Sequence, residues 1–213
     1  MKPQVLITGF SKFPGAPVNP TERLIEWLKV QDLSRFDAAF HFHLFKTSYA
    51  KTDHDLVELS KRLNPDVVLH FGLDQNAAGF KLEGRGKNAL HDDKPDVDGH
   101  CPAAHISADG AHEIASTFPA HLIGERLRDQ GFTVQHSTDA GGYLCNYLLY
   151  QTLSPNVWQT PPRQAGFIHV PHLEEHRAIV EGMSDDRLCF MERESLESGC
   201  LAIVEVCLEN LAH

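Results

Sequence analysis

Short apolar runs alternate with amphipathic stretches along the chain. Residues 4–10, 66–72 and 165–170 are almost continuously apolar, which is typical of strands covered on both faces. Residues 38–45 instead alternate between apolar side chains and histidines. This alternation predicts a further strand that lies near an edge of the sheet.

Apolar residues at helical spacing fill the stretches between these strands. Asn19 and Pro20 suit the N-cap and the first position of a helix that continues to residue 30. Further helices are predicted at residues 50–63, 119–130 and 192–211. Strands and helices that alternate in this way predict a parallel α/β sheet.

The predicted fold is a three-layer α/β/α sandwich around a mostly parallel, twisted sheet. The 213 residues contain no repeat, low-complexity tract or linker, so we expect one domain over residues 1–213. Residues 91–110 are polar, rich in histidine and interrupted by Pro and Gly. They predict an irregular excursion or lid that extends to about residue 112.

One stretch, residues 132–153, combines these signals with reactive chemistry. Its first six residues predict a buried strand, and its last eight have helical spacing. Gly141 and Gly142 between them allow a sharp turn. Cys145 therefore falls in the first turn of a helix, where free N–H groups and the positive dipole end favour a nucleophilic thiolate and can hold an oxyanion. The alternative is that Cys145 is a small buried hydrophobic residue.

Two further residues have the chemistry to act with this cysteine. His169 ends an apolar strand, where open parallel sheets place their sites, and an imidazole beside a thiolate can exchange protons with a leaving amine. The alternative role for His169 is that of a hydrogen-bonded histidine in the core. Glu83 could orient that imidazole, but Asp74 and Asp139 are equally well placed by sequence.

Two groups of histidines raise the alternative of a zinc site. One is His169, His172 and His176, and the other lies in the lid at positions 91, 100 and 105. Pro171 interrupts the first group, and the aspartate-rich surroundings of the second are typical of a solvated loop. We therefore expect no metal.

Composition narrows the function classes. Nineteen Lys and Arg face 29 Asp and Glu, so the net charge of −10 disfavours nucleic acids and anionic membranes as partners. No apolar run of about 18 residues is present, which predicts no membrane span. The five cysteines lack CxxC spacing and the N-terminus lacks a signal-peptide pattern, so we expect reduced thiols in the cytoplasm.

Two aromatic residues follow the first strand. Phe10 and Phe13, in GFSKF, should face the crevice at the carboxyl edge of the sheet, where they suit a small flat ring. Anchoring the loop onto the core is the alternative role for them.

Four segments resemble the signatures of one family, pyroglutamyl peptidase I. GFSKFPGAPVNPT resembles its N-terminal signature, AGGYLCNYLLY its cysteine motif and GFIHVPHL its histidine motif, while LEGRGKNAL stands where the family has its glutamate strand. The order and spacing of all four agree, and together they extend from residue 5 to residue 173.

The resemblance implies a cysteine peptidase that removes N-terminal pyroglutamate from peptides, without a cofactor. By the same resemblance, Cys145 is the nucleophile, His169 the general base and acid, and Glu83 the carboxylate that orients His169. A homotetramer or homodimer is also implied. The positions that match the family's pyroglutamyl pocket are Phe10, Phe13, Tyr143 and Leu144.

Two places depart from the family pattern. Leu73 and Asp74 stand where many members have a glutamine that meets the lactam, so we expect Leu73 to contact the substrate. Asp92 and Asp93 stand near the place of an arginine that some members carry. These residues, with the lid residues Asp96 and Asp98, motivate two alternatives: a same-fold cysteine amidase or peptidase with altered acyl specificity, or a catalytically silent homologue.

Overall fold

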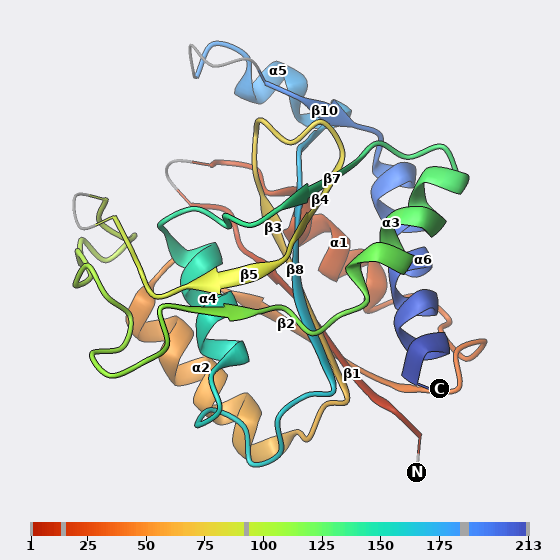
Figure 1. Cartoon of the computed structure of the whole chain (residues 1–213). Coiled ribbons are helices and arrows are strands. Elements are labelled where there is room, and N and C mark those ends of the chain that lie inside the picture. The colour runs from red at the N-terminus through yellow and green to blue at the C-terminus, as the bar shows by residue number, and fades with distance from the viewer. Residues whose placement is uncertain (1, 14–15, 92–93, 184–187, 212–213) are drawn as a thin grey trace.

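The structure is a computed structural model that describes residues 2–13, 16–91, 94–183 and 188–211. Its main sheet has six strands (Figure 1). Four of them are mutually parallel, whereas the other two run in the opposite direction. In spatial order the strands are β2 (Ala39–Phe45), β1 (Gln4–Phe10), β3 (Val67–Leu73), β8 (Gln164–Val170), β4 (Phe80–Glu83) and β7 (Val134–Ser137).

Helices cover both faces of this sheet. The side chains of α1 (Pro20–Leu28), α3 (Ala120–Asp129) and α6 (Arg193–Leu211) belong to one apolar cluster. Those of α2 (Tyr49–Arg62) and α4 (Leu144–Leu153) belong to another. Figure 1 shows α2 and α4 across the sheet from α3 and α6. The predicted three-layer sandwich with a mostly parallel sheet is therefore confirmed.

Smaller elements extend this framework. A two-stranded antiparallel pair, β5 (Arg85–Lys87) and β6 (Glu113–Ala115), encloses the region predicted as a lid. The described part of residues 88–112 contains no helix or strand. Beyond β8 come β9 (His172–Leu173), a short 3₁₀ turn (Glu174–His176), α5 (Arg177–Val180) and β10 (Phe190–Met191).

Local sequence signals explain several element boundaries. The Asn19 side chain accepts a hydrogen bond from the Thr21 amide at 3.0 Å, and Pro20 begins α1, as predicted. The alternating strand β2 lies at one edge of the sheet, which confirms its predicted position.

The strand predicted as buried at residues 132–137 is the main correction to the fold. The observed strand β7 begins at Val134 and forms the other edge of the sheet, with Gln135 and His136 exposed. The apolar signal came largely from Phe132, which precedes the strand and packs edge-on against Phe80 at 5.5 Å between ring centroids. Phe132 is only half-buried, and the residues that follow it belong to an edge strand.

The reversal of β4 determines what lies beside His169. Because β4 is antiparallel to β8, Lys81 stands directly opposite His169, and Glu83 lies opposite Phe167. Directly opposite residues in an antiparallel pair project to the same face, and so do positions two apart in one strand. Lys81, Glu83 and His169 therefore share one face of the sheet.

Asn146, the third residue of α4, links this helix to the chain that leaves the sheet. Its buried side chain accepts a hydrogen bond from the Lys87 amide at 2.8 Å. It also donates to the carbonyl oxygens of Lys87 and Ala89, at 2.8 and 2.9 Å. The start of α4 is thereby fixed against β5.

We expect Asn146→Ala to lower the free energy of unfolding by about 2 kcal/mol, because it removes three hydrogen bonds that a buried side chain makes to the backbone of Lys87 and Ala89. Chemical denaturation measures this change. The exposed Asn64→Ala is the control, and it should leave the midpoint within error. Equal stability of the two variants would contradict the role assigned to Asn146.

Candidate active site

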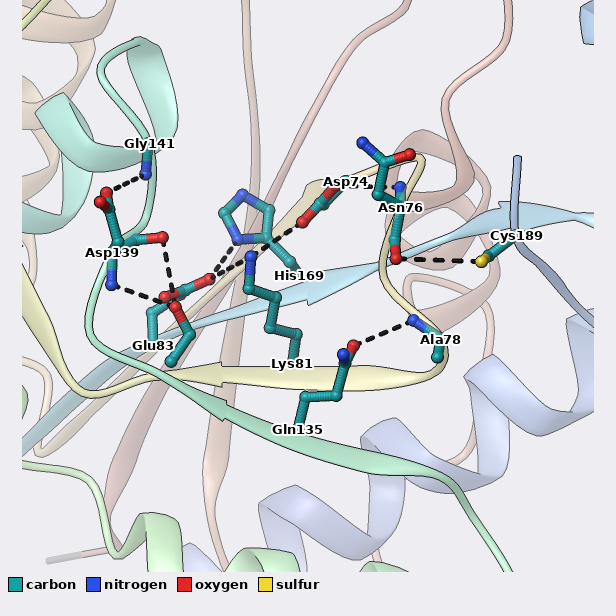
Figure 2. Close-up of polar contacts among 11 residues, drawn as sticks. Asp74, Asn76, Ala78, Lys81, Glu83, Gln135, Asp139, Gly141, His169 and Cys189 are labelled. Carbon is teal, nitrogen blue, oxygen red and sulfur yellow. Dashed lines mark hydrogen bonds and ion pairs between the residues drawn. The ribbon is translucent and has the colours of Figure 1, made fainter. Parts of the chain in front are cut away.

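Cys145 lies in the first turn of α4, as the sequence predicts. The turn before it contains Gly141 at φ +83°, a conformation that favours glycine. The Gly141 amide donates to the Asp139 side chain at 3.0 Å (Figure 2). The N-cap residue Tyr143 makes no side-chain capping bond, so no N-cap side chain occupies the first-turn N–H groups of the helix.

The space around the sulfur is tightly limited. A Cβ added at Gly72 in β3 would lie 3.1 Å from Cys145 Sγ and 2.6 Å from the ring of Phe167. The Phe167 ring in turn packs against His169, with 4.7 Å between ring centroids. Gly72 thus provides the room in which the cysteine approaches the histidine.

Glu83 holds the His169 ring through the Nδ1 atom. His169 Nδ1 lies 2.8 Å from Glu83 Oε1 (Figure 2), and Glu83 is completely buried. This bond engages Nδ1 and leaves Nε2 as the ring nitrogen for the cysteine. The structure therefore brings Cys145, His169 and Glu83 together in that order, from α4, β8 and β4.

Opposing effects determine the charge of this imidazole. Burial by itself would lower the pKa of His169, but the negative charges of Cys145 and Glu83, and hydrogen bonds to both, raise the pKa to about 9. At neutral pH the ring next to Cys145 is therefore an imidazolium.

A cavity of about 630 Å³ opens in front of this pair. Cys145 and His169 lie in its wall, whereas Glu83 lies behind His169 and does not line it. All five residues that the sequence predicts as substrate contacts also line it: Phe10, Phe13, Leu73, Tyr143 and Leu144.

Two polar lining residues were missed by the sequence analysis. Thr47 follows β2, and its buried Oγ1 has no hydrogen-bond partner among the described residues. Asn19 lines the same wall while it caps α1. The sequence does contain a signal for Thr47. It lies two residues after the carboxyl end of the parallel strand β2, and active sites form at that edge of such sheets.

Part of the cavity wall comes from the region predicted as a lid. The Tyr143 hydroxyl donates to the Pro95 carbonyl at 3.0 Å, and Lys94 Nζ lies 4.4 Å from the centre of the Tyr143 ring. Burial, together with nearby Asp96 and Cys145, raises the pKa of Tyr143 to about 12. Tyr143 is therefore a neutral wall residue at neutral pH.

Asp96, one of the lid residues that motivate the alternative of altered acyl specificity, does not line the cavity. Asp96 is buried, and its carboxylate accepts hydrogen bonds from the backbone amides of Tyr49, Asp98 and His100 at 2.8–2.9 Å. It fixes the lid to the start of α2 rather than facing a ligand. Asp98 is exposed and does not line the cavity, and residues 92–93 lie outside the described part of the chain.

The histidine groups do not converge as the zinc alternative requires. Over residues 2–13, 16–91, 94–183 and 188–211, no three His, Cys, Asp or Glu side chains are arranged to hold a metal ion. His169 faces Cys145, whereas His172 and His176 are buried further along the chain. Among the described helices, none is long and apolar enough to cross a membrane.

Comparisons with known proteins agree with this geometry. The sequence profile described as pyroglutamyl peptidase matches residues 3–205. The pyrrolidone-carboxylate peptidase of Pyrococcus furiosus is 30% identical over 98% of this chain and 99% of its own length. That of Thermococcus litoralis is 31% identical over 87% of this chain and 86% of its own.

Solved structures give the same result. A mutant pyrrolidone carboxyl peptidase from Pyrococcus furiosus superposes with a TM-score of 0.89 at 29% identity, covering 98% of this chain and 99% of that one. The Thermococcus litoralis structure gives 0.87 at 28% identity, over 100% and 96%. The chain belongs to the pyroglutamyl peptidase family of cysteine peptidases.

Proposed function

We propose that this protein is a cysteine exopeptidase that hydrolyses the bond after an N-terminal pyroglutamyl residue, with Cys145 as nucleophile. The observation that carries this proposal is the placement of Cys145 and His169 in the wall of one cavity, with Glu83 bonded to His169 behind that wall. His169 acts as general acid and base, and Glu83 orients its ring.

The first half of the reaction forms an acyl-enzyme. The Cys145 thiolate attacks the carbonyl carbon of the pyroglutamyl residue, and the oxygen becomes an oxyanion that the first-turn amides of α4 can stabilise. The His169 imidazolium then gives its proton to the departing amine as the C–N bond breaks. A thioester and the shortened peptide result.

The second half regenerates the enzyme. Neutral His169 takes a proton from water, and the oxygen attacks the thioester carbon. The C–S bond breaks, which releases pyroglutamate and the thiolate. The imidazolium and the thiolate are thereby restored.

The chemistry of the cavity suits a neutral lactam. Phe10, Phe13 and Leu144 offer apolar surface for a small flat ring, and Thr47 Oγ1 is a buried polar atom in need of a partner. A lactam brings an N–H and a carbonyl but no charge. Asp74, which motivates the alternative of a different acyl group, is ion-paired with Lys81 at 2.9 Å and presents no free charge.

We expect Cys145→Ala to reduce the release of fluorophore from pyroglutamyl-aminomethylcoumarin by at least about 10⁴-fold, because no other group can form the thioester. The exposed Cys101→Ala, which keeps Cys145, is the matched control and should retain wild-type turnover.

Two other outcomes would redirect the proposal. If the wild type releases no fluorophore while iodoacetamide labels Cys145 quickly at neutral pH, the nucleophile is active and the pocket accepts another acyl group. If Cys145 is also unreactive, the protein is a catalytically silent homologue.

The charge of His169 predicts the alkaline side of the pH profile. Because its pKa is raised to about 9, the proton needed by the leaving amine is present at neutral pH and is lost as the pH rises through about 9. We expect kcat/KM to fall there. Glu83→Gln removes the carboxylate charge that favours the imidazolium, so it should move this fall to lower pH and reduce kcat/KM by roughly 10²–10⁴-fold. If kcat/KM decreases at the same pH in Glu83→Gln as in the wild type, the role assigned to Glu83 is contradicted.

We also propose that the enzyme is a cytoplasmic homotetramer or homodimer. The support is the family resemblance, together with five cysteines that are all free thiols. Sedimentation velocity at micromolar concentration should give a mass that is two or four times 23.8 kDa. A single species at the monomer mass would exclude this assembly.

A further inference from the structure

Lys81 lies between two carboxylates, and it lines the cavity of the candidate active site together with Asp74. Its ammonium group is 2.9 Å from Asp74 Oδ2 and 3.7 Å from Glu83 Oε1 (Figure 2). Its side chain is only 24% exposed, and burial lowers its pKa less than the two carboxylates raise it. Lys81 is therefore a fixed cation beside the carboxylate that holds His169.

The contacts form a line of alternating charge, which we call the charge row: Asp74, Lys81, Glu83, His169 and Cys145. Figure 2 shows its first four members in this order. Each internal member lies between partners of opposite sign. The row begins at the turn after β3, crosses β4 and β8, and ends on α4.

The Glu83 carboxylate contacts two members of the charge row, His169 and Lys81. Its Oε2 atom is buried and has no hydrogen-bond partner within the described residues, so Oε1 faces both His169 and Lys81. A completely buried carboxylate is stable only when it is well paired. Lys81 supplies the second cation beside Glu83, next to the Oε1 atom that also faces His169.

We propose that Lys81 is a positioning residue of the peptidase reaction, which holds the Glu83 carboxylate against His169 and moderates the pull of that carboxylate on the imidazolium, while Asp74 holds Lys81 in place. This inference rests on the proposed function and adds two residues to the three inferred there.

The two added residues act on His169 with opposite sign. Without Lys81, Glu83 and Asp74 are uncompensated anions, so the imidazolium is overstabilised and becomes a weaker acid for the leaving amine. Without the Asp74 charge, Lys81 compensates Glu83 fully, and the imidazolium loses its proton more easily. A residue with only a structural role would not produce two shifts of opposite direction.

Other charged groups near His169 contribute a constant background. Asp139, in the turn before α4, is paired with Lys87 at 2.9 Å. Lys94 lies over the Tyr143 ring, and His91 lines the far wall of the cavity. None of these groups changes in the variants that test the proposal.

The test is the pH dependence of kcat/KM in Lys81→Met, Lys81→Arg and Asp74→Asn. We expect the pH at which kcat/KM decreases on the alkaline side to rise by about one unit in Lys81→Met and to drop by a similar amount in Asp74→Asn. Lys81→Arg keeps the cation and should restore the wild-type profile. We also expect kcat to fall about tenfold in Lys81→Met with little change in KM, because protonation of the leaving amine is slowed.

Lys61→Met is the matched control, since it removes a lysine paired with Glu58 at 2.9 Å on the surface of α2. It should leave the profile unchanged. Shifts in the same direction for Lys81→Met and Asp74→Asn, or no shift in either, would overturn the proposal. A rise in KM alone for Lys81→Met would do so too, because it would indicate a direct contact between Lys81 and the substrate.

A second readout separates this proposal from the proposed function. The ring proton of His169, followed by NMR in histidine-labelled protein, reports its titration without any substrate. Opposite shifts of that titration in the two variants would support the charge row even if no pyroglutamyl substrate is turned over. Unshifted titrations in folded variants would overturn the charge row even if the wild type is fully active.

Discussion

The bond between the buried Glu83 carboxylate and His169 is the interaction on which the rest of the site depends. At 2.8 Å and without access to water, it orients the ring and favours the imidazolium that faces Cys145. A carboxylate in such a place is costly unless it is paired. The fold therefore has to bring cations to Glu83, and it does so with His169 from β8 and Lys81 from β4 itself.

The antiparallel pairing of β4 with β8 meets this requirement, and β7 beyond β4 shares the reversed direction. A parallel β4 would need a different register beside β8, whereas the antiparallel pairing sets Lys81 opposite His169 and leaves Glu83 on the same face two residues later. On the other side, Gly72 leaves the space through which Cys145 reaches the ring. The direction of β4 and the glycine at position 72 thus determine the geometry of the whole site.

The sequence predicted those parts of the site that depend on local patterns. Cys145 at a helix start and His169 at a strand end both follow from hydrophobic spacing next to glycine or proline. Glu83 could not be separated from Asp74 and Asp139 in this way, because the choice depends on the direction of β4, and no local pattern encodes that direction. The same limit explains β7, whose position at the edge is determined by pairing, and Asp96, which accepts a hydrogen bond from the Tyr49 amide at the start of the distant helix α2.

The charges around the cavity are arranged so that a neutral group can bind. The chain carries a net charge of −10, yet among the described residues the two acidic residues in the cavity wall are both paired: Asp74 with Lys81, and Asp139 with Lys87. Lys94 lies against the face of an aromatic ring. An unpaired carboxylate in this wall would attract cations and would stabilise the imidazolium further. Pairing removes both effects, so shape and a few polar atoms are left to select the acyl group, while the charge row acts on His169 alone.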